Sequence, residues 1–100
     1  MLPAENTFDN NILSTLESLL KDRLSNPVEG LYTSYLFEKG VDKILKKVAE
    51  ETGEVIIAAK NNNNELVYEI SDLMYHLLVL MVNQGVALND IYQELNTRRK

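Results

Sequence analysis

The two longest helical patterns in this 100-residue sequence are joined by a run of four asparagines. Residues 41–60 and 64–83 both repeat apolar side chains at the three- and four-residue spacing of an amphipathic helix. In the second segment, the predicted inward stripe includes Ile70, Leu73 and Leu77. The connecting residues Asn61–Asn64 suit a tight polar turn. Because helices joined by so short a turn run antiparallel and side by side, the sequence predicts a helical hairpin at the centre of the fold.

Two further segments precede the hairpin. Residues 8–24 carry a leucine-rich helical stripe, with Thr7 or Asp9 as its N-cap. The proline- and glycine-containing residues 25–30 interrupt it. The sequence then predicts one short helical turn over residues 32–37, which ends before the hairpin begins.

After the hairpin, Gly85 is predicted to end the second long helix as its C′ residue, and residues 88–98 form a last amphipathic helix. Nothing in the sequence favours strands or an internal repeat. We therefore expect residues 1–100 to form a single all-α domain, an antiparallel bundle of four main helices. Because so short a chain buries only part of its apolar surface, we expect a homodimer to complete the core.

Composition excludes several classes of function. A formal net charge of −5 argues against a nucleic-acid groove, which needs a basic face. The absence of cysteine excludes disulfides and thiolate metal sites. The N-terminal residues lack the features of a signal peptide, and the longest apolar run, Leu77–Val82, is too short to cross a bilayer. We expect a cytoplasmic protein that binds neither membranes nor nucleic acid.

Five carboxylates form two clusters within the hairpin. Glu50, Glu51 and Glu54 lie on its first helix, and Glu69 and Asp72 on its second. Antiparallel pairing brings Glu54 level with Glu69 and moves Glu50 and Glu51 towards Asp72. Unpaired carboxylates are costly to bury in an apolar surrounding, and Mg²⁺ prefers oxygen ligands that it shares with substrate phosphates. The clusters therefore predict a magnesium site for phosphate chemistry.

Two other interpretations of the acidic residues stay open at this point. Lys46–Glu50 and Lys47–Glu51 have the spacing of solvated ion pairs on a helix surface. A di-iron carboxylate bundle is the nearest chemical competitor, but it requires Glu-x-x-His pairs on two helices, and His76 is the one histidine of the chain.

Basic and polar residues near the clusters suit a metal-bound polyphosphate. Tyr32 and Thr33 are candidates for contact with a ribose or phosphate, and His76 for a hydrogen bond to Asp72 or contact with substrate. Tyr68 and Tyr75 are predicted to lie away from the apolar face, in a nucleobase pocket or, as the favoured alternative, at a dimer interface. The basic candidates are Arg23, Lys39, Lys43, Lys46, Lys47 and Lys60.

These motifs resemble the phosphoribosyl-ATP pyrophosphatases over nearly the whole chain, and more widely the MazG-like all-α nucleotide pyrophosphohydrolases. The similar segments are residues 23–40, 43–60, 69–80 and 85–88. E-E-x-x-E followed by E-x-x-D is the shared signature of the wider group. The chain departs from the family pattern at Leu24, Leu31 and Tyr35, on the substrate side, and at Ala49.

The resemblance implies hydrolysis of phosphoribosyl-ATP to phosphoribosyl-AMP and pyrophosphate, the second step of histidine biosynthesis. It implies Mg²⁺ held by Glu50, Glu51, Glu54 and Asp72, with Glu69 a ligand or the orienter of the attacking water. Glu51 or Glu54 would accept the proton of that water. The implied substrate contacts are Arg23, Tyr32, Thr33, Lys39, Lys43, Lys47 and His76.

Two alternatives remain beside this interpretation, together with one implied partner. A house-cleaning nucleoside triphosphate pyrophosphohydrolase would use the same metal site on other nucleotides. A non-catalytic helical dimerisation module would need no metal. The resemblance also suggests association with a separate cyclohydrolase.

Overall fold

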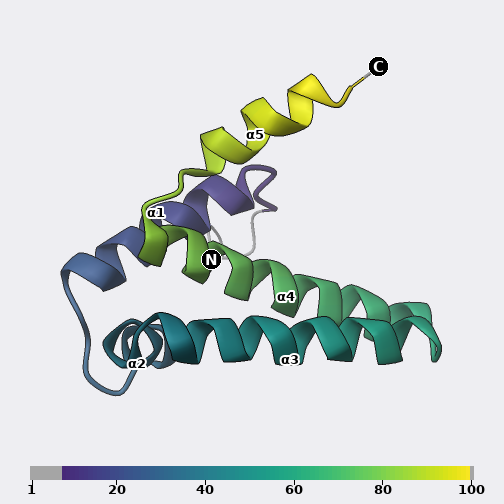
Figure 1. The fold of residues 1–100 in the computed structure, drawn as a ribbon, viewed down its shortest axis with the longest axis horizontal. Helices are drawn as coiled ribbons and strands as arrows, with labels where there is room; N and C mark the ends of the chain where they lie inside the picture. The colour runs from purple at the N-terminus through teal and green to yellow at the C-terminus, as the bar shows by residue number, and fades with distance from the viewer. Residues whose placement is uncertain (1–7, 100) are drawn as a thin grey trace.

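The computed structural model describes residues 8–99, and this part of the chain is helical with no strand. The predicted all-α fold is therefore confirmed, with the short second helix added to four longer ones (Figure 1). The five helices are α1 (Ile12–Ser25), α2 (Tyr32–Lys39), α3 (Val41–Ala59), α4 (Asn63–Gln84) and α5 (Leu88–Thr97).

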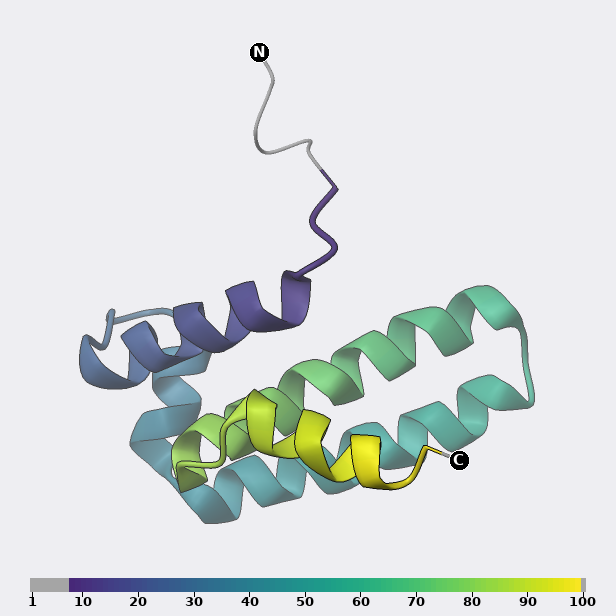
Figure 2. The same ribbon diagram turned by 90° about the horizontal axis from the view of Figure 1, so that it is seen from above.

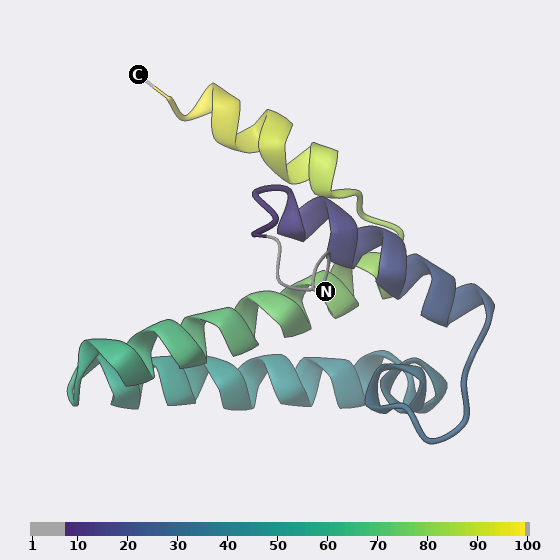
Figure 3. The same ribbon diagram turned by 180° about the vertical axis from the view of Figure 1, so that it is seen from behind.

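The predicted hairpin of α3 and α4 is confirmed and forms the longest part of the molecule (Figures 1 and 3). The asparagine turn also starts α4, because the Asn62 side chain accepts a hydrogen bond from the Glu65 amide at 2.9 Å. Gly85 ends α4 in the left-handed conformation, with φ of 76°, as predicted for a C′ residue.

Helix α1 begins at Ile12, four residues later than predicted. The Asp9 carboxylate accepts hydrogen bonds from the Asn11 amide at 2.8 Å and the Thr15 hydroxyl at 2.7 Å. These bonds hold residues 9–11 in a turn ahead of the helix, so Asp9 precedes the N-cap position, which Asn11 occupies. The alternative N-cap Thr7 lies outside the described residues.

Helix α2 has eight residues where the sequence predicted a single turn. It is seen end-on beside α3 in Figure 1, so it lies across the start of the hairpin. Leu36 is fully buried and anchors it to the core. Gly40, with φ of 93°, separates α2 from α3 and allows the sharp change of direction.

One apolar core joins all five helices. On α4, however, the buried face differs from the predicted stripe, since Ile70 and Leu77 are 39% and 38% exposed. Apolar residues surround much of α4, so their spacing alone did not identify the face that packs inward. The buried core residues are Leu20, Leu36, Ile44, Leu78, Val79, Val82 and Leu88.

Helix α5 begins beside α1 and extends away from the hairpin (Figures 1 and 3), so that in the view from above it crosses over the hairpin (Figure 2). The carboxylate of Glu17 on α1 accepts a hydrogen bond from the Leu88 amide at 2.7 Å, which caps the start of α5. The rest of α5 leaves Ile91 and Leu95, predicted as its apolar face, 38% and 55% exposed. No helix among the described residues is long and apolar enough to cross a membrane.

Candidate active site

Glu51, Asp72 and His76 converge where α3 and α4 lie side by side. One ligand atom from each of these side chains lies within 4.8 Å of the other two. Glu51 comes from the middle of α3, whereas Asp72 and His76 are four residues apart on one face of α4. We call these three residues the acidic centre. The predicted approach of Glu51 to Asp72 is thus present in the fold.

His76 is buried and connects the acidic centre to α2. Its Nδ1 lies 2.9 Å from the Asp72 carbonyl oxygen and 3.3 Å from the Asp72 carboxylate, and its Nε2 lies 2.9 Å from the Tyr32 hydroxyl. A carbonyl oxygen only accepts, so we assign the proton to Nδ1. Nε2 then accepts from Tyr32, and neither ring nitrogen is free to bind a metal.

The Tyr32 hydroxyl is suited to the donor role in this network. Partial burial raises its pKa, and the negative charges of Asp72 and Glu51 act in the same direction, against the opposing effect of Lys47. The hydroxyl therefore stays protonated at neutral pH. Tyr32 thereby fixes the first turn of α2 against the acidic centre.

Glu51 is a carboxylate in an unfavourable position for a negative charge. Its side chain is only 11% exposed, and Lys47 is its cationic partner, at 3.7 Å. Burial raises the pKa of the Glu51 carboxyl, and a hydrogen bond with Asp72 and the Asp72 charge raise it further. Lys47 also contacts Glu50 at 3.2 Å, a hydrogen bond that raises the pKa of the lysine and keeps it charged.

The remaining two predicted acidic residues, Glu54 and Glu69, border the acidic centre. Burial raises the pKa of the Glu69 carboxyl, with further increases from the charges of Glu54 and Asp72. Glu54 is exposed on α3. Four of the five predicted carboxylates, Glu51, Glu54, Glu69 and Asp72, thus interact electrostatically across the hairpin. Glu50 instead pairs with Lys47 on its own helix, and within residues 8–99 Lys47 is the lysine or arginine that forms ion pairs with this group.

Tyr75 lies next to the acidic centre, a position that the sequence pattern did not predict. It was predicted to lie away from the apolar face, but it packs against the core, and its hydroxyl lies 2.6 Å from the Thr33 hydroxyl. Tyr32 and Thr33 of α2 therefore bond to the consecutive residues His76 and Tyr75 of α4. A contact between side chains 42 residues apart leaves no signal in local periodicity. Tyr68, by contrast, is 69% exposed.

The other basic candidates lie around the acidic centre and not within it. The Lys39 and Lys43 ammonium groups lie 5.7 and 6.0 Å from the centre of the Tyr35 ring, at cation–π distance. Arg23, near the end of α1, pairs with Asp22 at 3.0 Å. Among the described residues, no hydrogen bond or ion pair joins Arg23, Lys39 or Lys43 to the acidic centre.

The donors of this site fit a hard divalent cation. The ligands that the site offers a cation are carboxylate oxygens, because both nitrogens of His76 already take part in hydrogen bonds. A bound cation would offset the repulsion between Glu51 and Asp72 that raises the Glu51 pKa. An oxygen-rich donor set of this kind suits a hard divalent cation, whereas zinc prefers nitrogen and sulfur ligands.

Comparison with known proteins identifies the family. Residues 13–99 match the model of the phosphoribosyl-ATP pyrophosphohydrolase family. A phosphoribosyl-ATP pyrophosphatase of Listeria innocua is 62% identical over 87 residues, which are 87% of this chain and 84% of the relative. A phosphoribosyl-ATP pyrophosphatase of Clostridium botulinum is 56% identical over 92 residues, 91% of this chain and 84% of the relative.

A longer relative matches equally well. The histidine biosynthesis bifunctional protein HisIE of Caldanaerobacter subterraneus is 61% identical over 90 residues. The match covers 89% of this chain but only 44% of that protein. Since the family model covers most of the sequence, the chain belongs to the phosphoribosyl-ATP pyrophosphohydrolase family.

Proposed function

We propose that this protein hydrolyses phosphoribosyl-ATP to phosphoribosyl-AMP and pyrophosphate, the second step of histidine biosynthesis. The observation that carries the proposal is the convergence of Glu51 and Asp72 on the facing helices of a chain that belongs to this family. The family is one of hydrolases, which argues against a non-catalytic dimerisation module.

We propose that Mg²⁺ is the cofactor. The residues that would hold it are Glu50, Glu51, Glu54, Glu69 and Asp72. When bound, the ion would supply positive charge that offsets the negative charge developing on the phosphate groups and makes water a better nucleophile. The proposal is supported by the burial of Glu51 and by the shortage of cations around five carboxylates.

The proton of the attacking water requires an acceptor within the chain. We assign this role to Glu51 or Glu54, because a carboxylate with a raised pKa is a stronger base than an ordinary one. The raised pKa of Glu51 supports it as the first choice. Glu69, at the border of the group, would orient the water.

The substrate side of the site includes α2 and the basic residues. Lys47 is the cation nearest to the acidic centre and would contact a phosphate of the reacting anhydride. Tyr32, Thr33 and His76 would position the substrate, since His76 belongs to the acidic centre, Tyr32 bonds to His76, and Thr33 bonds to the adjacent Tyr75. Arg23, Lys39 and Lys43 would attract the remaining phosphates.

The first experiment is pyrophosphate release from phosphoribosyl-ATP, with and without Mg²⁺, beside ATP and deoxynucleoside triphosphates. We expect release from phosphoribosyl-ATP that a chelator abolishes and that readdition of Mg²⁺ restores. Release mainly from free triphosphates would contradict the proposal and favour a house-cleaning pyrophosphohydrolase.

We further propose that residues 1–100 form one domain that acts as a homodimer in the cytoplasm. The dimer is supported by apolar side chains left exposed on the hairpin. Association with a separate cyclohydrolase is supported by the bifunctional relative, in which a similar region makes up 44% of the protein. The net charge of −5 supports the absence of nucleic-acid or membrane partners.

A further inference from the structure

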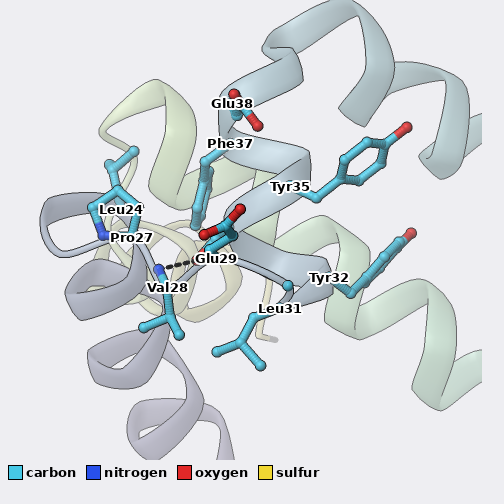
Figure 4. Close-up of a pocket in the computed structure, with 11 residues that line it drawn as sticks. Leu24, Pro27, Val28, Glu29, Leu31, Tyr32, Tyr35, Phe37 and Glu38 are labelled. Carbon is cyan, nitrogen blue, oxygen red and sulfur yellow. Dashed lines mark hydrogen bonds between the residues drawn. The ribbon is translucent and has the colours of Figure 1, made fainter.

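A second feature lies beside the acidic centre, along the outer side of α2. An open cavity of about 980 Å³ is lined by α2 and by the loop that connects it to α1 (Figure 4). Leu24 and Phe37 contribute apolar lining, and Tyr32 and Tyr35 contribute aromatic rings. The volume lies at the upper end of the range of roughly 300–1,000 Å³ found for small-molecule sites, so it accommodates a nucleoside.

The two tyrosines offer an exposed aromatic surface in this cavity. Figure 4 shows both side chains projecting from α2 in the same direction. Their ring centres lie 6.4 Å apart with 28° between the planes, and the residues are 46% and 40% exposed. Tyr32 is held by His76, and Tyr35 lies against the ammonium groups of Lys39 and Lys43. Rings held in this way stack on flat aromatic ligands at little entropic cost.

The charges of the cavity favour a base over a phosphate. Its lining includes the carboxylates of Glu29 and Glu38, and no lysine or arginine of the described residues belongs to it. Carboxylates repel phosphate groups but accept hydrogen bonds from the amino and hydroxyl groups of a nucleoside. The phosphates of a nucleotide would instead lie towards Lys47 and the acidic centre.

Tyr32 connects the cavity with the acidic centre. The residue is part of the cavity lining, its ring projects from the edge of the cavity (Figure 4), and its hydroxyl bonds to His76, which contacts Asp72. A bound nucleotide could therefore reach from the cavity to the acidic centre. On this basis, and resting on the proposed function, we infer that the Tyr32–Tyr35 pair stacks on the purine base of the nucleotide substrate.

The test compares two probes that differ only by the base, AMP and ribose 5-phosphate. Their dissociation constants are measured by calorimetry with Mg²⁺ for the wild-type protein and for Tyr35→Leu. We expect wild type to bind AMP more tightly than ribose 5-phosphate. Tyr35→Leu should weaken AMP binding about tenfold, as expected for the loss of one stacked base, and leave ribose 5-phosphate binding unchanged. The KM for phosphoribosyl-ATP should rise in parallel while kcat changes less than twofold.

Two further variants complete the design. Tyr35→Phe keeps the ring and should restore AMP binding to within twofold of wild type. Tyr92→Leu makes the same substitution at a tyrosine of similar exposure on α5, 42%, and should leave both constants unchanged. Equal binding of the two probes by wild type, or an equal loss of both in Tyr35→Leu, would overturn the inference. Failure of wild type to hydrolyse phosphoribosyl-ATP would overturn the proposed function instead, since the binding comparison needs no turnover.

Discussion

At the scale of single residues, Glu51 is the side chain on which most of the proposed chemistry depends. Glu51→Gln keeps its size and removes its charge, so we expect hydrolysis to fall at least about 100-fold, the lower range for loss of a general base. The fold should be retained, because the amide still reaches Asp72. Steady-state rates and circular dichroism check both points. Glu94→Gln, at an exposed carboxylate paired with Arg98, is the matched control and should keep full activity. Normal turnover of Glu51→Gln would contradict the assignment.

The raised pKa of Glu51 also predicts how stability depends on pH. A carboxyl whose pKa is higher in the folded than in the unfolded state stabilises the fold below its ordinary value of 4.5. That contribution is lost as the pH rises through the folded-state pKa. In chelator, Glu51→Gln should therefore gain stability relative to wild type as the pH rises above 4.5, and the gain should level off once the pH exceeds the folded-state pKa. Urea unfolding of both proteins across this range measures the difference, and a difference independent of pH would contradict the prediction.

Residue spacing predicted part of this site but not all of it. The approach of Glu51 to Asp72 followed from a short turn between two periodic helices, which are local features. The positions of Tyr75 and His76 depend on how α2 docks on α4, and no local pattern encodes a contact between residues so distant in sequence. The sequence therefore identified the acidic side chains but not the hydrogen bonds that hold them in place.

At the scale of elements, α2 is attached to α4 by two adjacent hydrogen bonds from its first turn, Tyr32 to His76 and Thr33 to Tyr75. Tyr75→Phe removes one of them and leaves the Thr33 hydroxyl without its partner. We expect a loss of about 1 kcal/mol in the free energy of unfolding. The KM should rise as well, because α2 carries the proposed substrate contacts.

The control for Tyr75→Phe is Tyr68→Phe, the same change at an exposed tyrosine of the same helix. Urea unfolding should place Tyr68→Phe within about 0.5 kcal/mol of wild type, as for most surface substitutions. Equal stability of the two variants would show that the Thr33–Tyr75 bond does not hold α2 in place.

The elements themselves were predicted well, and their packing faces less well. The periodicity of α3 and α4 and the turn residues Asn61–Asn64 and Gly85 are strong local signals, which is why these boundaries agree to within one residue. The predicted inward face of α4 was wrong at Ile70 and Leu77, because a helix that is apolar on several sides has no unique buried stripe.

At the scale of the whole molecule, the hairpin exposes apolar side chains that a stable monomer would normally cover. Ile56, Ile57, Val67 and Tyr68 are between 59% and 69% exposed near the end of α3 and the start of α4. Large apolar side chains exposed near the same end of a hairpin indicate a candidate interaction site. It also accounts for the mixed faces of α4, since a helix between a core and a partner has apolar residues on both sides.

A second copy of the chain is the proposed partner for this surface, and charge placed on it should separate the copies. Ile57→Glu buries a carboxylate in the interface, so we expect sedimentation velocity to change from a dimer for wild type to a monomer for the variant. Stability should also become independent of protein concentration in the variant. Asn64→Glu adds the same charge at an exposed polar residue near the turn and should remain dimeric. A wild-type monomer at micromolar concentration would overturn the prediction, and the exposed face would then belong to a different partner.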